Sequence, residues 1–375
     1  RTQCESTILA AEPDEKTGGG RIALDGTVFY PEGGGQPCDT GALGTALVTD
    51  VQEHGGVITH TVSAALPVGQ TVEGRIDWAR RRDHMEQHTG EHILSGTLHR
   101  LFGAENVGFH IGSPAVRMDM SVPLTAGQLA EAEAQANAVI RADAPVRCWY
   151  PAPEDLAKLT YRSKKEIDGA VRLVDAGGAD LCACCGTHVS TTGQVGAIKI
   201  LSAQSYKGGT RLAVVCGERA HQSIAAAWQD AAAVGTLLSS APGRLLPAVQ
   251  NLQTAEAALK QRLAAMQNAL SEALAQAAVP GQPAVLHCDG ADGDGLRRIC
   301  LAVSARTNAL TAVLASGGQG LAYALCLPGG DVRPVCKALN EAFGGRGGGK
   351  PGFCQGSLAC TDFADVQNFL VNYHE

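Results

Sequence analysis

The alternation of apolar and polar residues over the first eighty positions is typical of short β-strands. Runs such as residues 27–30 and 45–48 are rich in Val, Thr and aromatic side chains, and they lie between Gly, Pro and Asp residues that favour turns. Several short strands at this spacing favour a small closed or sandwiched antiparallel sheet. We therefore predict a small N-terminal β-barrel over residues 1–80.

The pattern changes to a helical period after the predicted barrel. Apolar residues recur three and four positions apart from residue 77 to residue 101, and again over residues 126–142. Thr125 stands immediately before the second run, where its hydroxyl can cap a helix. Mixed helical and strand-like patterns continue to about residue 217. We predict an α+β core over residues 81–217.

Residues 218–280 are almost purely helical in composition, and one half carries a heptad pattern. Its apolar positions follow alternating steps of four and three, with Glu256 in the one gap: Leu245, Val249, Leu252, Leu259, Leu263, Met266 and Leu270. Such a seam over more than three heptads is typical of a coiled coil. Pro242-Gly243 interrupts the region and Pro280-Gly281 ends it. We expect a helical hairpin or coiled-coil arm, and a homodimer through residues 245–274 and the C-terminal domain.

Strand-like segments at residues 284–287, 309–315 and 321–327 alternate with helical ones in the last part of the chain. This pattern predicts a compact C-terminal α/β domain over residues 281–375. The fold class expected for the whole chain is therefore α+β and multidomain, in four parts: barrel, core, arm and tail.

Composition and charge narrow the class of protein. The chain has 375 residues, of which 45% are hydrophobic and 18% charged, as in globular proteins. Charges interrupt every apolar run, and the first residues lack a signal-peptide core, so we expect no membrane association and a cytoplasmic location. The 13 cysteines then belong to a reducing compartment. The net charge of −7 argues only weakly against nucleic-acid binding, because basic patches on one face are sufficient.

Two short motifs carry residue types that bind metal ions. His88 and His92 stand four apart, which places both imidazoles on one face of a helix. Cys184 and His188 follow in the sequence Cys-Cys-Gly-Thr-His. Together the four side chains make a tetrahedral ligand set suited to one Zn²⁺ ion per chain. Cys182 and Cys185 remain alternatives to Cys184. Four protein ligands are usual in a structural zinc site, whereas a catalytic site keeps one position open.

A glycine-rich segment is the other dense signal. Residues 29–37 read Phe-Tyr-Pro-Glu-Gly-Gly-Gly-Gln-Pro. The three consecutive glycines, Gly33, Gly34 and Gly35, allow the backbone to approach a ligand closely, and their N–H groups can face an anionic or carbonyl oxygen. Glu32 and Gln36 flank them. We predict that this loop faces a substrate.

These three motifs, in this order, resemble those of the freestanding alanyl-tRNA editing proteins (AlaX family) and of the editing domain of alanyl-tRNA synthetase. The glycine-rich segment 344–351 and Gln355-Gly356 resemble the synthetase's C-terminal, DHH-associated domain. The resemblance spans nearly the whole chain and implies the large form of the editing protein. Cys185 departs from it, because the synthetases commonly have Gly at that position.

The resemblance implies a zinc-dependent deacylase that acts in trans on mischarged tRNA-Ala, hydrolysing the ester of serine or glycine. It implies that His88, His92, Cys184 and His188 hold the zinc and that the loop at Gly33, Gly34 and Gly35 lines the pocket. Glu32, Gln36 and His110 are the catalytic candidates, any of which could recognise the serine hydroxyl. We expect the basic patches to bind tRNA, with these residues as candidates: Arg81, Arg82, Lys164 and Lys165.

Other functions fit parts of the sequence. His88-x-x-Glu91-His92 fits the signature of inverted zinc peptidases, with Glu105 or Glu166 as third ligand. Residues 344–350 are similar to a phosphate-binding P-loop, but Pro351 replaces the Ser or Thr that holds magnesium. We therefore expect no nucleotide cofactor, and we expect this segment to be a loop that faces RNA or a subunit. A non-catalytic tRNA-binding module stabilised by zinc is the third alternative. We identify no class II aminoacylation domain before residue 80 and expect no ligase activity.

Overall fold

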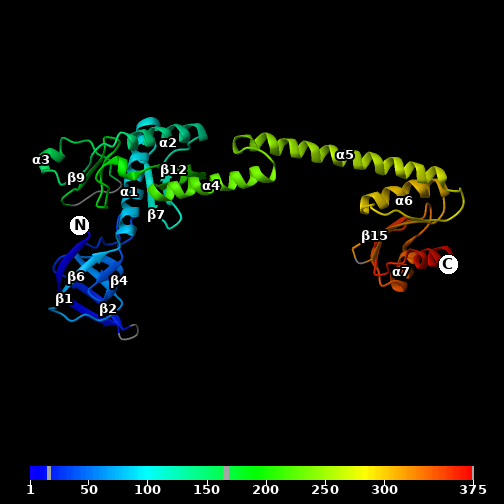
Figure 1. Ribbon diagram of the computed structural model, residues 1–375, viewed down its shortest axis with the longest axis horizontal. Helices are drawn as coiled ribbons and strands as arrows, with labels where there is room; N and C mark the ends of the chain where they lie inside the picture. The colour runs from blue at the N-terminus through cyan, green and yellow to red at the C-terminus, as the bar shows by residue number, and fades with distance from the viewer. Residues whose placement is uncertain (15–17, 164–168, 319, 374–375) are drawn as a thin grey trace. The chain divides into compact units, whose positions relative to one another are not determined.

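The computed structural model describes residues 1–14, 18–163, 169–318 and 320–373, and it divides into two compact units, Arg1–Ala231 and Ala232–Glu375. Figure 1 shows helices and strands in both units, so the predicted α+β class is confirmed. Each unit has its own buried core.

The first part of the N-terminal unit is a closed, six-stranded antiparallel barrel with the strand order β1-β2-β5-β4-β3-β6. Alternate side chains such as Ile8, Leu43 and Val51 point inward and are almost fully buried. The predicted N-terminal barrel is therefore confirmed. Its strands are β1 (Gln3–Asp14), β2 (Gly19–Leu24), β3 (Gly41–Leu43), β4 (Ala46–His54), β5 (Val57–Val62) and β6 (Thr71–Ile76).

Helix α1 (Trp78–Phe102) leaves the barrel directly and forms the centre of the rest of this unit, as the cyan helix of Figure 1 shows. It packs against α2 (Ala126–Arg141) and against a four-stranded sheet of order β12-β13-β8-β7. Thr125 caps α2 as expected, accepting a hydrogen bond from the backbone of Gln128. The sheet consists of β7 (Asn106–Ile111), β8 (Val116–Met120), β12 (Ile198–Tyr206) and β13 (Gly209–Cys216).

A small three-stranded sheet of order β11-β10-β9 lies beside α1. Its strands are β9 (Val146–Trp149), β10 (Leu173–Ala176) and β11 (Leu181–Ala183), with α3 (Pro153–Leu156) and the 3₁₀ turn η1 (Thr192–Val195) in the connections. Gly96 of α1 has no room for a side chain, because a Cβ there would collide with the backbone of Ala179. The turn between β10 and β11 therefore comes directly onto the helix.

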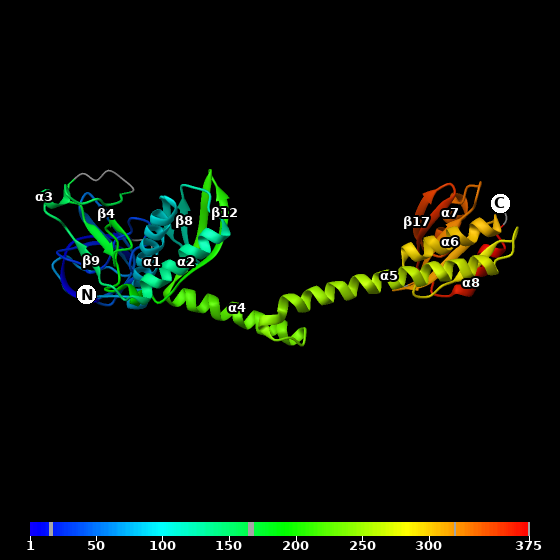
Figure 2. The same cartoon turned by 90° about the horizontal axis from the view of Figure 1, so that it is seen from above.

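The long helical region is broken where the sequence predicts, into α4 (Gly217–Leu237), the 3₁₀ turn η2 (Pro242–Arg244) and α5 (Leu245–Ala277). The two compact units meet within α4, so the predicted arm over 218–280 belongs to both, and the four-part division of the chain stays a prediction. In the C-terminal unit α6 (Gly293–Thr307) packs along α5, as Figure 2 shows, and Arg298 donates to Asn268 at 3.1 Å.

The C-terminal sheet has the order β14-β15-β16-β18-β17. One face packs on α6, and the other packs on α7 and α8. The alternation of β15 explains this, since Val313 points to α6 whereas Ala312 and Leu314 point to the other core. The elements are β14 (Ala284–His287), β15 (Thr311–Gly317), β16 (Gly320–Cys326), α7 (Arg333–Ala342), β17 (Arg346–Lys350), β18 (Phe353–Leu358) and α8 (Phe363–Val371).

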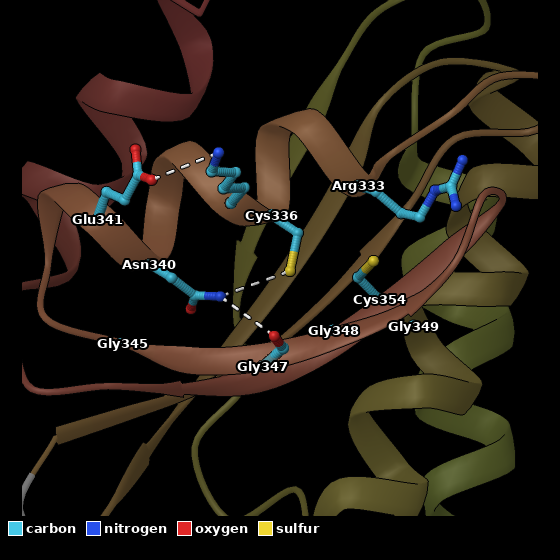
Figure 3. A pocket seen from close by; sticks show the side chains of 10 residues that line it. Arg333, Cys336, Asn340, Glu341, Gly345, Gly347, Gly348, Gly349 and Cys354 are labelled. Atoms are coloured by element: carbon cyan, nitrogen blue, oxygen red, sulfur yellow. Dashed lines mark hydrogen bonds and ion pairs between the residues drawn. The ribbon is translucent and has the colours of Figure 1, made fainter.

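The glycine-rich tail motif is an edge strand, β17, where we expected a loop. It lies beside α7, and a cavity of about 440 Å³ separates the two (Figure 3). Asn340 reaches across from α7 and donates to the carbonyl of Gly347 at 3.4 Å. A phosphate-binding P-loop follows a strand and precedes a helix. The order here, helix then strand, is the reverse, which supports the rejection of that alternative.

Candidate metal centre

Helix α1 buries an unusual run of polar side chains. Asp77 caps its first turn by accepting from the N–H of Arg80, and Gly103 ends it in the left-handed conformation. Within the helix, His88 and His92 are buried on one face. Gly90 packs so closely against Cys216 that a Cβ would not fit. Polar groups buried in this way need partners, and those of His88 and His92 come from the barrel and from the β10–β11 segment.

The segment after β11 brings the cysteine motif to this helix. The backbone N–H of Cys184 donates to the backbone carbonyl of Arg172 at 3.0 Å. The Arg172 guanidinium in turn donates to the carbonyls of Cys184 and Gly186, at 2.7 and 3.0 Å. Gly186 lies against the His88 ring, and a Cβ at this position would overlap the imidazole. The glycine of the motif is therefore needed for close approach to His88.

Four side chains converge as predicted: His88, His92, Cys184 and His188 place one possible ligand atom each within 4.8 Å of all the others. Cys184 Sγ lies 3.4 Å from His88 Nε2 and 3.5 Å from His188 Nε2. Of the alternative thiols, Cys185 is exposed, and Cys182 belongs to a second group with His92 and Asp180. The arrangement can hold a metal ion, and Cys184 is the thiol that completes the group of four.

Each histidine of this group has its other ring nitrogen fixed by a neighbour. His88 Nδ1 lies 2.8 Å from Gln36 Oε1, and that oxygen also accepts from the backbone N–H of Thr187 at 3.1 Å. His92 Nδ1 lies 3.0 Å from a carboxylate oxygen of Asp180. His188 Nδ1 lies 3.2 Å from the Thr89 hydroxyl. Acceptors at Nδ1 hold the proton there and leave Nε2 free to bind a metal.

Burial and neighbouring charges set the ionisation of the cluster. Burial lowers the pKa of His188 to about 3, which favours the neutral ring that a metal ion requires. Burial alone would raise the pKa of Cys184, but the imidazoles of His88 and His188 outweigh it and hold that pKa well below its usual range. His188 therefore stands as a neutral imidazole beside the Cys184 thiolate, and both are donors for borderline-soft divalent ions. Burial would lower the pKa of His92, but Cys182, Glu91 and Asp180 outweigh it and hold that pKa well above its usual value, so a metal ion would have to displace a proton from this ring.

The glycine loop contacts the candidate metal centre directly through Gln36, and indirectly through Phe109 of β7, which lies between Gly35 and His88. Gln36 is fully buried, and the loop backbone is tied to β7 because the N–H of Ile111 donates to Gly35 at 2.8 Å. A Cβ on Gly35 would collide with Phe109, whose ring lies 5.0 Å from that of His88. Gly34 is exposed and has a positive φ of 60°. The loop thus forms one wall beside the cluster.

Two of the predicted catalytic residues lie differently from Gln36. Glu32 is exposed and accepts from Gln52 at 3.3 Å. His110 is also exposed, and neighbouring side chains of a strand point to opposite faces, so the contact of Phe109 with His88 turns His110 away from the cluster. The geometry therefore speaks against a catalytic role for His110.

The basic residues predicted to bind tRNA differ in their exposure to solvent. Arg81 is only 8% exposed; its guanidinium pairs with Asp39 and donates to the carbonyl of Val28 at 2.8 Å, so it is not available to a phosphate. Arg82 is exposed and pairs with Glu86 at 2.9 Å. Lys164 and Lys165 lie outside the described residues.

The peptidase alternative loses support at its third ligand. Glu105 is not in either candidate metal group of the described residues, and it pairs with His99 at 2.8 Å. Glu166 lies outside the described residues.

Sequence reasoning missed the groups that hold the ligands in place. Asp180 and Arg172 stand in no recognised motif, and Thr89 lies within the histidine motif but was given no role; each contacts the cluster or its loop only in the folded chain. Cys182 was considered as an alternative ligand, and Asp180, two residues before it, is close enough to the cysteine motif to have been suspected as well. Arg162, which contacts Asp180, had no signal beyond its positive charge.

Comparison with known proteins agrees with this site. The model of the threonyl and alanyl tRNA synthetase second additional domain matches residues 171–213, which include the cysteine motif. A model of class II tRNA synthetases matches residues 6–80, a segment in which we had recognised no aminoacylation domain and which forms the barrel. The fold and site therefore define a protein built from parts shared with tRNA synthetases.

Individual relatives narrow this class. The alanyl-tRNA editing protein Aarsd1-B of Xenopus laevis is 30% identical over 347 residues, covering 90% of this chain and 84% of the relative. The alanyl-tRNA editing protein Aarsd1 of Danio rerio is 29% identical, covering 95% of this chain and 89% of its own. The alanine–tRNA ligase of Pyrobaculum neutrophilum is 34% identical, but this chain spans only 40% of its length. The chain belongs to the alanyl-tRNA editing protein family.

Within the described residues, no helix combines the length and the apolar character that crossing a membrane requires.

Proposed function

We propose that this protein removes serine or glycine from mischarged tRNA-Ala by hydrolysing the ester at the 3′-terminal adenosine. The observation that carries the proposal is the convergence of His88, His92, Cys184 and His188 beside the glycine loop. Membership of the alanyl-tRNA editing protein family supports the substrate class. The reaction adds water to the ester carbonyl, breaks the bond to the ribose oxygen and returns a proton to that oxygen.

Zinc is the ion that the donor set fits best. In a tetrahedral site with Zn–N and Zn–S bonds of about 2.1 and 2.3 Å, the nitrogen–sulfur separations are about 3.6 Å. Cys184 Sγ lies 3.4 and 3.5 Å from two imidazole nitrogens, close to that value. One thiolate and three imidazoles are also typical zinc ligands. When bound, the ion supplies Lewis acidity for the ester carbonyl or its attacking water.

The residues of the chain position the reacting groups. Gln36 holds the His88 ring from the barrel side and is therefore a positioning residue. Phe109 covers one side of His88 and limits access of bulk water. The exposed backbone at Gly34 can face the ester, since an activated ester needs chiefly orientation. With Gln36 occupied, Glu32 is the loop side chain left to recognise a serine hydroxyl, which would favour seryl over alanyl esters.

Binding of tRNA would come from exposed basic side chains, among them Arg82. Neutralisation of phosphates releases counterions, so the affinity for tRNA should fall steeply as salt rises. An affinity for tRNA-Ala that is independent of salt would contradict this part of the proposal.

The test combines metal content with deacylation. The purified full chain should contain one zinc per protomer and should release serine and glycine from tRNA-Ala much faster than alanine. His92→Ala should lose both zinc and deacylation, while the C-terminal unit keeps its fold. Unchanged hydrolysis of seryl-tRNA-Ala by this variant would overturn the assignment of the site. A zinc-loaded protein that binds tRNA but deacylates none of the three would favour the non-catalytic binding module.

We also propose that a second copy of this chain covers the apolar seam of α5. Leu252, Leu259 and Met266 are 57%, 62% and 69% exposed, and α6 packs on another face of the helix, through Leu274 and Ala275. Exposed apolar stripes of this length mark interaction surfaces. Antiparallel pairing matches the seam to itself in four layers: Leu245 with Leu270, Val249 with Met266, Leu252 with Leu263, and Glu256 with Leu259.

The charged seam position favours the antiparallel arrangement. A parallel dimer in register would set Glu256 against the partner's Glu256, and like charges at that position are destabilising. In the antiparallel arrangement Glu256 lies next to the partner's Lys260, and Lys260 already pairs with Glu256 within one helix at 2.7 Å. The C-terminal domain follows α5 in each copy and would extend the dimer contact.

A further inference from the structure

Asp180 connects one ligand of the metal centre to a fixed arginine. One oxygen of its carboxylate lies 3.0 Å from His92 Nδ1. Both oxygens also accept hydrogen bonds from Arg162, at 2.8 Å from Nε and 2.9 Å from Nη2. Asp180 is 6% exposed, so bulk water does not replace these partners.

Arg162 is itself held in place. Its backbone N–H donates to Leu181, and its carbonyl accepts from Ala183, both at 2.9 Å, which joins it to strand β11. Its guanidinium also donates to Ser95 of α1 at 2.5 Å. The arginine therefore fixes Asp180 relative to both α1, which carries His88 and His92, and β11, which leads directly into Cys184.

This arrangement decides between two candidate metal groups that share His92. The second group consists of His92, Asp180 and Cys182, and Cys182 Sγ lies 3.0 Å from His92 Nδ1. A cation there would compete with the Arg162 guanidinium for the Asp180 carboxylate, and like charges so close repel each other. The second group is therefore unsuited to a cation, whereas the group of four contains no bound arginine.

We propose that Asp180, held by Arg162, is a positioning residue that keeps the proton of His92 on Nδ1 and directs Nε2 to the centre formed with His88, Cys184 and His188. The inference rests on the proposed metal-dependent function. Cys182 is then a neighbour of the metal centre and does not bind the ion. A carboxylate behind a ligating histidine fixes both the ring orientation and the tautomer, and its loss weakens metal binding.

The test measures metal affinity of the full chain by chelator competition with Zn²⁺. Asp180→Ala should bind zinc about 10–100-fold more weakly, the range typical of lost outer partners. Asp180→Asn keeps an acceptor for His92 Nδ1 and should recover part of that loss. Cys182→Ser should bind zinc like the parent protein. The matched control is Asp119→Ala, because Asp119 forms a similar two-bond pair with Arg211, at 2.6 and 2.8 Å, away from the metal ligands.

A second readout separates positioning from folding. Nitrogen-15 NMR of histidine-labelled, zinc-loaded protein should show His92 protonated at Nδ1 in the parent and in Asp180→Asn, and should show that state lost or mixed in Asp180→Ala. Parent-like zinc affinity and an unchanged His92 tautomer in Asp180→Ala would overturn the inference. If the parent chain binds no zinc, the proposed function fails instead, so the two failures are distinguishable.

Discussion

Helices α1 and α5 both depart from the usual rule that polar side chains are exposed and apolar ones buried. Helix α1 does so by burying polar residues, and α5 by exposing apolar ones. Helix α1 buries charged and polar side chains, including Arg81, His84 and Glu91. Helix α5 exposes most of its leucines, and among the described residues Ser271 is the only buried one in it. Buried polar groups are costly unless partners satisfy them, and large exposed apolar stripes are typical of interaction surfaces. The burial in the first helix fits the proposed metal site within the chain, and the exposure of the second fits the proposed dimer surface.

The largest effect is expected from charging the seam of α5. Leu259→Glu combined with Leu263→Glu should convert the dimer to a monomer, because each fully buried leucine contributes about 1.5–3 kcal/mol. Light scattering or sedimentation of the full chain measures this. The matched control is Leu246→Glu, which is 69% exposed but off the seam and should leave the dimer intact. If the parent protein is itself monomeric, the proposed role of α5 as a dimer surface is wrong.

The next effect concerns the buried ion pair that joins α1 to the barrel. Asp39 is fully buried and pairs with Arg81. Asp39→Ala should lower the free energy of unfolding by about 3–5 kcal/mol, since it leaves a buried charge without a partner. The exposed pair of Glu12 and Arg21 offers the contrast. Glu12→Ala should change stability by less than about 1 kcal/mol in the same denaturant titration. Equal losses in both variants would refute the distinction.

A smaller effect is expected from adding one methyl group beside α1. Gly186→Ala should weaken zinc binding about 10–100-fold, as loss of an outer partner does, because the new Cβ displaces the His88 ring. Chelator competition measures the change. Cys185→Ala, at the neighbouring exposed position, should bind zinc normally. Parent-like affinity in Gly186→Ala would show that the loop can move aside.

The last effect, confined to mildly acidic pH, is a change in pH dependence from His84. Burial lowers the pKa of this side chain to about 4, and its Nδ1 has no hydrogen-bond partner in the described residues. The unfolded chain, with a histidine pKa near 6.5, then binds more protons than the folded chain between about pH 6.5 and pH 4. Stability should therefore fall as pH falls through that window. His84→Gln should flatten the slope in urea titrations, whereas His54→Gln, at an exposed position, should leave it unchanged.

The sequence predicted those parts of the molecule that depend on local pattern. The three-and-four periodicity of α1 and the Thr125 cap of α2 are confirmed, because these signals lie within one helix. The group of four candidate ligands was predictable because His88 and His92 stand one helical turn apart and Cys184 and His188 lie in one short motif. The barrel was recognisable from its turns and alternating strands.

Other parts depend on contacts between distant segments. From the sequence, Arg81 was expected to be an exposed basic residue. In the folded chain its guanidinium instead pairs with Asp39, 42 residues earlier. His110 stood beside the right residue, but strand alternation gives the inward position to Phe109. The partner of His92 comes from a turn 88 residues later. No local sequence pattern predicts these long-range contacts, because they arise from the packing of the barrel and the sheets on α1.

The separation of the metal ligands along the chain has a consequence for synthesis. His88 and Cys184 are 96 residues apart, and Gln36 contacts Thr187 across 151 residues. A growing chain therefore cannot close the centre until both the barrel and the segment through His188 have emerged, and such long-range closure is slow. Until then the imidazoles of α1 lack their thiolate and their acceptors. An ion that binds only the finished arrangement would stabilise the folded chain by mass action, so the proposed metal would enter after the barrel and the segment through His188 have packed on α1.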